Sequence, residues 1–188
     1  MPIGETLPKF NWIDIVVISL IFIASYRGFK KGIIVEMFKL LSIVLSIYIS
    51  MHYFSVVSDL LYKYFPIAKL TLWDFISFTS LAVLAYFAVV VLRGIFLRFI
   101  KVEAAGSLNK WGGLLTGLLR GLLTVSMIFL LFYFSTVGYL KESVQKSSLG
   151  SRCALIDVKV YECIFNNVAS KFFPGEKLNQ GIYEVLEE

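Results

Sequence analysis

Four ionisable side chains lie inside or beside long apolar runs of this sequence: Asp14, Arg27, Glu36 and Arg120. A charged group in hydrocarbon is costly, so such residues usually pair with one another or mark a pathway for an ion or a substrate. The chemistry open to them is therefore ion pairing or the transport of a charged solute. We treat all four as candidate site residues.

Two of these charges also have a structural explanation. Asp14 follows Trp12 near the start of a short apolar run, where the helix macrodipole favours an acid. Glu36 and Lys39 are three residues apart, so they can pair on one helix face or reach the lipid head groups by snorkelling. We favour the macrodipole for Asp14 and snorkelling for Glu36 over a role in transport.

The sequence GLLTGLLRGLL at residues 113–123 places three glycines four residues apart. On a helix, Gly113, Gly117 and Gly121 share one face, which lets another helix approach closely in lipid. We expect this glycine face to pack against a helix of the same chain or of another copy.

Arg120 stands beside the glycine face, and its side chain leans toward the N-terminal end of its helix. Two geometries follow from this position. Either 113–137 is a single tilted span in which a partner holds Arg120, or 107–118 lies at the interface and the span begins at Gly121.

The sequence shows no catalytic or metal-binding constellation. Its one histidine, His52, has no cysteine, carboxylate pair or second histidine at ligand spacing, so we expect an interfacial or packed residue. Glycine-rich phosphate loops and the G-x-S-x-G and H-E-x-x-H motifs are missing from the sequence. We therefore expect no enzyme activity, no bound metal and no cofactor.

The composition indicates the elements that must position these residues. The chain has 188 residues, of which 58% are hydrophobic and 16% are charged, and its mean hydropathy is +0.79. These values indicate a membrane protein, and an apolar run of about 20 residues is needed to cross a bilayer core of about 30 Å. We expect an all-α membrane domain over 1–137, with four transmembrane helices in two hairpins, at about 12–30, 33–57, 73–100 and 111–137.

The basic residues predict the orientation of these helices. Lysine and arginine concentrate after the first helix, at Arg27, Lys30 and Lys31, and after the third helix, over 93–110. By the positive-inside rule these connections face the cytoplasm, which places both termini on the outer side. We expect the first helix to stay as an anchor, because no basic leader or small-x-small cleavage site accompanies it.

The net charge of +5 follows from this topology. The cations are divided among short connections beside the membrane, where they can contact anionic lipid head groups. A nucleic-acid partner would require a basic face on a folded soluble region. We therefore expect the lipid bilayer to be a partner and nucleic acid not to be one.

After the fourth helix the chain becomes polar and forms an outward-facing tail over 138–188. Apolar residues recur at spacings of three and four from Asp157 to Phe173, which predicts an amphipathic C-terminal helix. This helix either lies on the membrane or a partner, or packs back onto the protein's own loops. Cys153 and Cys163 would be about 15 Å apart on a continuous helix, so we expect two free thiols.

Three motifs together resemble the CvpA family, the colicin V production proteins. The motifs are WID at 12–14, RGFKKGIIVE at 27–36 and LNKWGGLLTGLLRGLL from Leu108. The resemblance runs from about 11 to 137 and extends more loosely to about 173. It departs from the family pattern at Asn109, where the family often has an acid.

The resemblance implies a multi-pass protein of the bacterial cytoplasmic (inner) membrane with four spans. It also implies a link to production and export of the toxin colicin V and to envelope homeostasis. It supplies no established reaction and no substrate.

Two functions follow from these residues. The first is an accessory scaffold that assembles with itself, or with other membrane proteins of an export system, through the glycine face. The second is a small-solute channel or transporter formed by an oligomer. A short parallel repeat over 12–28 and 73–94 would place its pathway between two hairpins, lined by Asp14, Arg120 and the glycine face. We prefer the scaffold, because one carboxylate and one boundary arginine are a small set for a transport pathway.

Overall fold

The computed structural model describes residues 12–99, 106–135, 137–147 and 149–187. These parts of the chain are mainly helical and contain no strand. Four of their helices are long and apolar enough to cross a membrane: α1 (Trp12–Lys31), α2 (Ile33–Tyr64), α3 (Leu70–Phe99) and α4 (Ser107–Phe134). The prediction of an all-α chain with four such helices is confirmed.

Glycine and proline set the boundaries of the long helices. Gly32 alone separates α1 from α2, and its φ of +81° lies in the left-handed region that favours glycine. Pro66 disfavours helical backbone at the preceding residue, and α2 accordingly ends at Tyr64. By contrast, α4 continues without a break through Gly121, so it is one helix of 28 residues.

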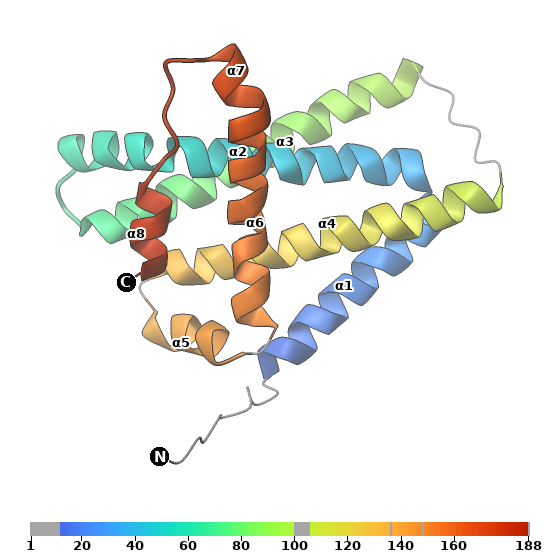
Figure 1. Ribbon diagram of the computed structural model, residues 1–188, viewed down its shortest axis with the longest axis horizontal. Helices are drawn as coiled ribbons and strands as arrows, with labels where there is room; N and C mark the ends of the chain where they lie inside the picture. Colours follow the sequence, from blue (N-terminus) through green and yellow to red (C-terminus); the bar gives the residue numbers. More distant parts are fainter. Residues whose placement is uncertain (1–11, 100–105, 136, 148, 188) are drawn as a thin grey trace.

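The long helices do not pair as the two expected hairpins. Along its length α1 packs against α4, while α2 packs against both α3 and α4 (Figure 1). The consecutive helices α1 and α2 have few contacts with each other, and so do α3 and α4. The consecutive helices α2 and α3, by contrast, do pack together, and α1 packs on α4 because the glycine face of α4 lets its backbone approach closely.

A second face of small residues lies on α2. Ser42, Ser46 and Ser50 are four residues apart and are all buried. Each hydroxyl donates a hydrogen bond to a backbone carbonyl one turn earlier, at 2.7–2.8 Å. These serines therefore keep the helix surface narrow without leaving a polar group unpaired in the core.

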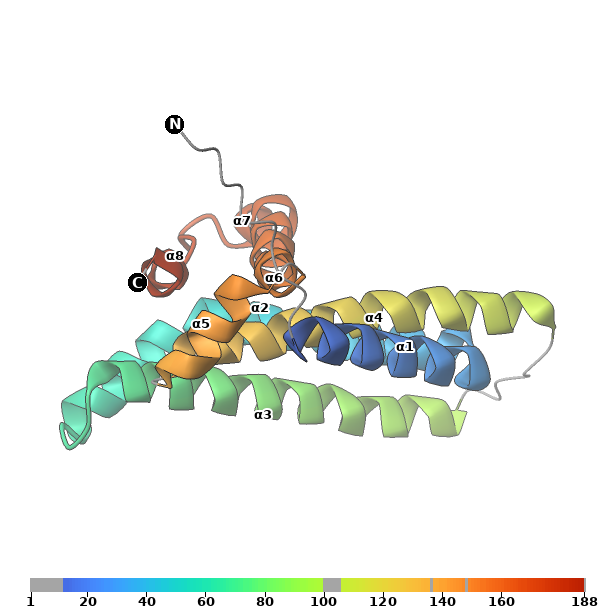
Figure 2. The same cartoon turned by 90° about the horizontal axis from the view of Figure 1, so that it is seen from below.

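The remaining helices form a cap, defined here as residues 138–187. It contains α5 (Gly138–Lys146), α6 (Gly150–Ile164), the π-helical turn η1 (Phe165–Ala169), α7 (Ser170–Phe172) and α8 (Gly181–Glu187). Figure 1 shows α6 crossing α4 at a steep angle, and Figure 2 shows α6, α7 and α8 on the opposite side of α2 and α4 from α3. The helix predicted over 157–173 is thus part of a longer helical segment that begins at Gly150.

Two clusters of buried side chains join the cap to the long helices. In the first, the rings of Phe54, Phe78 and Phe134 have centroids 4.7, 5.0 and 6.2 Å apart, and Tyr161 of α6 is in the same cluster. The second cluster lies under α5 and α6 and combines residues of α1, α4 and the cap. The cap therefore packs onto the chain's own long helices. Members of the second cluster include Ile13, Val17, Val125, Phe129, Val144 and Ala154.

Candidate functional site

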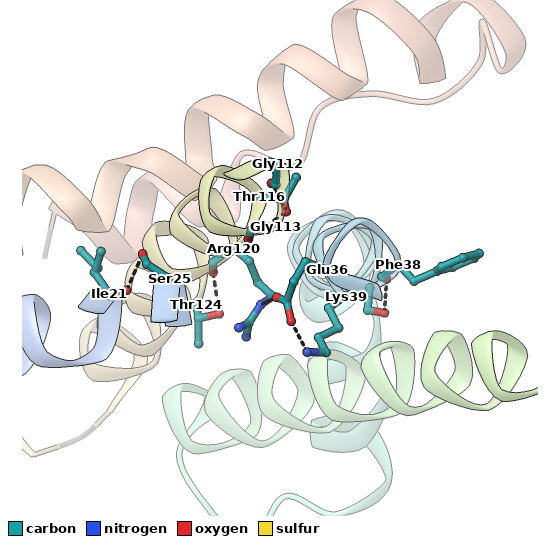
Figure 3. Close-up of polar contacts among 11 residues, drawn as sticks. Ile21, Ser25, Glu36, Phe38, Lys39, Gly112, Gly113, Thr116, Arg120 and Thr124 are labelled. Carbon is teal, nitrogen blue, oxygen red and sulfur yellow. Dashed lines mark hydrogen bonds and ion pairs between the residues drawn. The ribbon is translucent and has the colours of Figure 1, made fainter. Parts of the chain in front are cut away.

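A buried ion pair connects α2 to α4. Glu36, in the first turn of α2, is fully buried, and Arg120 Nε donates a hydrogen bond to its Oε2 at 2.8 Å (Figure 3). Lys39, one turn later on α2, donates to the other carboxylate oxygen. Glu36 and Lys39 therefore pair on one face of α2, which was one of the two alternatives for them, and α4 adds Arg120 to the same carboxylate.

This ion-pair cluster carries an excess of positive charge. One carboxylate, Glu36, faces the two cations Arg120 and Lys39, which leaves a formal charge of +1. Lys31, at the end of α1, adds to the positive potential at Lys39. The sequence pointed to Glu36 and Arg120 separately, and the structure brings them together.

The glycine face of α4 is filled by α1. A Cβ added at Gly117 would lie 2.7 Å from the Ala24 carbonyl oxygen, and one at Gly113 would lie 2.3 Å from the Gly28 carbonyl oxygen. Gly121 is covered in the same way by Ala24. The two helices thus meet backbone to backbone. The glycine face packs within the chain, as one of the two predicted alternatives, and lines no open pathway.

Asn109 and Arg27 lie at the same end of these helices. The Asn109 side-chain oxygen accepts a hydrogen bond from the backbone N–H of Ile33 at 2.8 Å, which satisfies one free donor at the start of α2. Arg27 is exposed on α1 and takes no part in the Glu36–Arg120 pair. We call this the basic end of the long helices, because it carries Arg27, Lys30 and Lys31.

Asp14 lies at the opposite end of α1 and holds the cap. It is fully buried, and its Oδ1 accepts hydrogen bonds from the Ser147 hydroxyl at 2.6 Å and from the Leu149 backbone N–H at 3.0 Å. Ser147 and Leu149 belong to the connection between α5 and α6. Asp14 and Arg120 therefore have separate partners at different places along the long helices.

His52 makes a second polar contact between the long helices and the cap. Its Nδ1 lies 3.0 Å from the Tyr161 hydroxyl, and its Nε2 lies 3.2 Å from a carboxylate oxygen of Glu176. The Asn179 side chain also donates to the Met51 carbonyl at 2.8 Å. No spacing in the sequence could reveal this contact, because His52 and Tyr161 are 109 residues apart.

Asp157 is a buried acid at the contact between α4 and α6. Neither of its carboxylate oxygens has a hydrogen-bond partner among the described residues, although its backbone N–H donates to the Ser126 hydroxyl at 3.0 Å. Burial raises the pKa of Asp157 well above its usual range, and the nearby Ser126 hydroxyl opposes this shift. The neutral, protonated form is therefore favoured in this apolar contact.

The family follows from comparison with known proteins. A family model described as colicin V production protein matches residues 13–154. The chain belongs to the colicin V production protein family. The matched region covers the four long helices, α5 and the start of α6, so it includes the Glu36–Arg120 pair and the contact of Asp14 with Ser147. No curated protein and no solved structure shows a significant match.

In this member of the colicin V production protein family both cysteines are free, as the spacing predicted. Cys153 is buried and Cys163 is exposed, and both lie on α6. Burial raises the pKa of the Cys153 thiol, and the negative charge of Asp14 adds to this effect. Among the described residues, no group of three or more His, Cys, Asp or Glu side chains is placed to hold a metal ion.

Proposed function

We propose that this member of the colicin V production family is an accessory scaffold of the bacterial cytoplasmic membrane. It would take part in colicin V production and export and in envelope homeostasis. Its long helices hold the cap in one fixed position on the outer side of the membrane, together with both termini. There the cap binds other membrane proteins of an export system or a second copy of the chain.

The burial of Asp14 beneath the cap is the observation that carries this proposal. Its carboxylate accepts two hydrogen bonds from the connection between α5 and α6. Lifting the cap would break both bonds, and hydrogen bonds to a charged group contribute about 1.5–3 kcal/mol each. This cost supports a cap that stays fixed on the long helices, as a binding platform requires.

The other candidate residues also support a structural role over transport. Glu36 and Arg120 bind each other at the basic end, whereas Asp14 binds the cap at the opposite end. The glycine face is occupied by α1. A channel would need these groups along one continuous path. Because α1 already covers the glycine face, we propose that the scaffold binds its partner through the cap.

The exposed aromatic end of α7 is the proposed binding surface. Phe172 is 75% exposed and is followed by the exposed Phe173, and Val168 is exposed one turn earlier. Aromatic side chains are enriched at the centres of protein interfaces, where they bury a large apolar area. A partner that covered these three side chains would remove this area from water.

Photo-crosslinking in native membranes tests the scaffold. A photoreactive phenylalanine analogue at Phe172 should crosslink to another protein chain, whereas the same analogue at Leu84, on the outer surface of α3, should not. Asp14→Ala should weaken the crosslink at position 172 about tenfold, because it releases the cap. Glu142→Gln is the matched control, since it removes an exposed acid of α5 and should leave the crosslink unchanged.

Two results would contradict this proposal. One is an Asp14→Ala protein that crosslinks at position 172 as strongly as the wild type while its cap has become sensitive to protease. The other is solute flux through the purified protein in vesicles that falls in Asp14→Asn or Arg120→Gln at unchanged expression. The second result would favour the oligomeric channel.

A further inference from the structure

A groove between α2, α3 and α4 extends from Arg120 of the ion pair toward the cap end of α4. Its volume is about 300 Å³, at the lower end of the range for small-molecule sites. The hydroxyls of Ser46, Thr79 and Thr124 in its wall already donate to carbonyls of their own helices, and Tyr86 adds a fourth hydroxyl to the lining. Arg120 is the one charged residue among the described residues that line it, and most of the remaining wall is apolar.

Arg120 has hydrogen-bonding capacity left at this end of the groove. A guanidinium has five N–H donors, and the Nε–H donates to Glu36 at 2.8 Å. No other acceptor among the described residues receives a hydrogen bond from it. The Arg120 side chain is 17% exposed, so its remaining N–H groups are not fully enclosed. Figure 3 shows the side chains of Arg120, from α4, and Lys39, from α2, on either side of Glu36 and pointing toward the light green α3.

The charges at this end favour an anion. The cluster of Glu36, Arg120 and Lys39 has a formal charge of +1, and Lys31 adds to the positive potential. A net charge held away from water is costly, and a bound anion would offset this cost. An anionic group that accepts the free Arg120 donors would therefore complete the cluster.

The direction of the groove matches the polarity of a lipid. On α4 its lining runs from Arg120 to Leu131, which is about 16 Å at 1.5 Å per residue. The charged end lies in the first two turns of α2, at Glu36 and Lys39, and midway along α4, at Arg120, and the apolar end lies toward the cap end of α4. Val83 and Phe87 in the α3 wall are exposed, so the groove opens sideways between the helices.

We propose that this groove binds one anionic phospholipid of the leaflet at the basic end. Its phosphate sits against Arg120 and Lys39, and one acyl chain lies between α3 and α4. Phosphate is the group that a guanidinium binds through several N–H donors at once, which favours a phospholipid over a free fatty acid. This site does not depend on the scaffold function.

Native mass spectrometry of the full chain in detergent tests the site. The protein is supplied with equal amounts of phosphatidylglycerol and phosphatidylcholine that have the same acyl chains. We expect one retained phosphatidylglycerol per chain, with a preference of roughly tenfold over phosphatidylcholine. Arg120→Gln should abolish the preference, whereas Arg27→Gln, which removes an exposed arginine at the same end, should keep it.

A second pair of variants leaves the ion pair intact. Val83→Phe narrows the groove and should lower retention of phosphatidylglycerol roughly tenfold, and Leu84→Phe, at a neighbouring position outside the groove lining, should not. The site is overturned if both lipids are retained equally by the wild type, or if Val83→Phe retains lipid as well as Leu84→Phe does. Displacement of the phospholipid by an equal amount of palmitate would overturn the choice of occupant.

Discussion

The two ends of the long helices hold their buried charges in different ways. At the basic end, Glu36 is matched charge against charge by Arg120 and Lys39. At the cap end, Asp14 is held by a hydroxyl and a backbone N–H, and the carboxylate of Asp157 has no hydrogen-bond partner among the described residues. At the basic end, the ion pairs hold α2 against α4. At the cap end, the hydrogen bonds of Asp14 hold the connection between α5 and α6, and the nearby Asp157 has a raised pKa.

The two ends also differ in how closely the chain segments approach. At the basic end the backbones of α1 and α4 meet, and even one added methyl group would overlap a carbonyl oxygen. At the cap end the contact is made by side chains, which can adjust their rotamers. We therefore expect the long helices to behave as one rigid body and the cap to be weakened separately from them. Four substitutions test this difference in stability.

Glu36→Gln should have the largest effect. It leaves Arg120 and Lys39 buried without a counter-charge, and removing one partner of a buried pair typically costs about 3–5 kcal/mol. Thermal and denaturant unfolding in detergent would measure the loss. The double variant Glu36→Gln with Arg120→Gln should recover part of it, and a single variant as stable as the wild type would show that this pair does not stabilise the fold.

Gly28→Ala should destabilise the protein by about 1–3 kcal/mol, the usual cost of overpacking. Its new Cβ would lie 2.2 Å from the Gly113 carbonyl oxygen, which cannot move without displacing α4. Gly94→Ala is the control, because a Cβ at Gly94 meets no atom within 4 Å. The same unfolding measurement should show no loss for Gly94→Ala, and equal losses in both variants would rule out close packing as the cause.

Asp14→Ala should loosen the cap while the long helices stay folded. It removes the acceptor of two hydrogen bonds, and we expect a local loss of about 2 kcal/mol, since bonds to a charged group contribute about 1.5–3 kcal/mol. Hydrogen exchange should rise in α5 and the start of α6 and stay unchanged in α2. Ser147→Ala should show a smaller effect in the same segment, and uniform exchange across all helices would refute a separable cap.

Asp157→Asn should have the smallest effect at low pH and should change the pH dependence of the cap. The pKa of Asp157 is raised in the folded protein, so protonation of this carboxyl stabilises the folded cap. The stabilisation is complete below about pH 3.9, which is the pKa of an aspartate in an unfolded chain. This contribution is lost as pH rises through the folded pKa, with a limiting slope of about 1.4 kcal/mol per pH unit. The stability of α6 measured by hydrogen exchange should therefore change less with pH in Asp157→Asn than in the wild type. The same pH dependence in both proteins would contradict a raised pKa for Asp157.

Apolar runs of sufficient length were enough to predict the four long helices. The predicted end of the second helix was short by about two turns, because α2 continues to Tyr64 through a polar stretch that includes Asp59. The expected hairpins joined α1 to α2 and α3 to α4, whereas the consecutive helices that pack together are α2 and α3, and α1 packs on the distant α4. The serine face of α2 was a readable signal of close packing, because its three serines are four residues apart.

The polar residues were easier to predict than their partners. Glu36 and Arg120 were identified from their apolar surroundings, but they are 84 residues apart and no periodicity relates positions on different helices. Asp14 was explained by the helix macrodipole alone. Its hydrogen-bond partners Ser147 and Leu149 are 133 and 135 residues away, so the sequence could not reveal them. A sequence shows that a charge is costly, whereas only the fold shows which group compensates it.

The unequal burial of the two cysteines gives this chain a built-in chemical reporter. Cys163 is open to a thiol reagent, whereas Cys153 is on the buried face of α6 and its raised pKa keeps the reactive thiolate scarce. A second label would therefore attach only in those molecules whose α6 has lifted from α1 and α4. The ratio of doubly to singly labelled chains would thus measure the open population of the cap in intact cells, without any engineered probe.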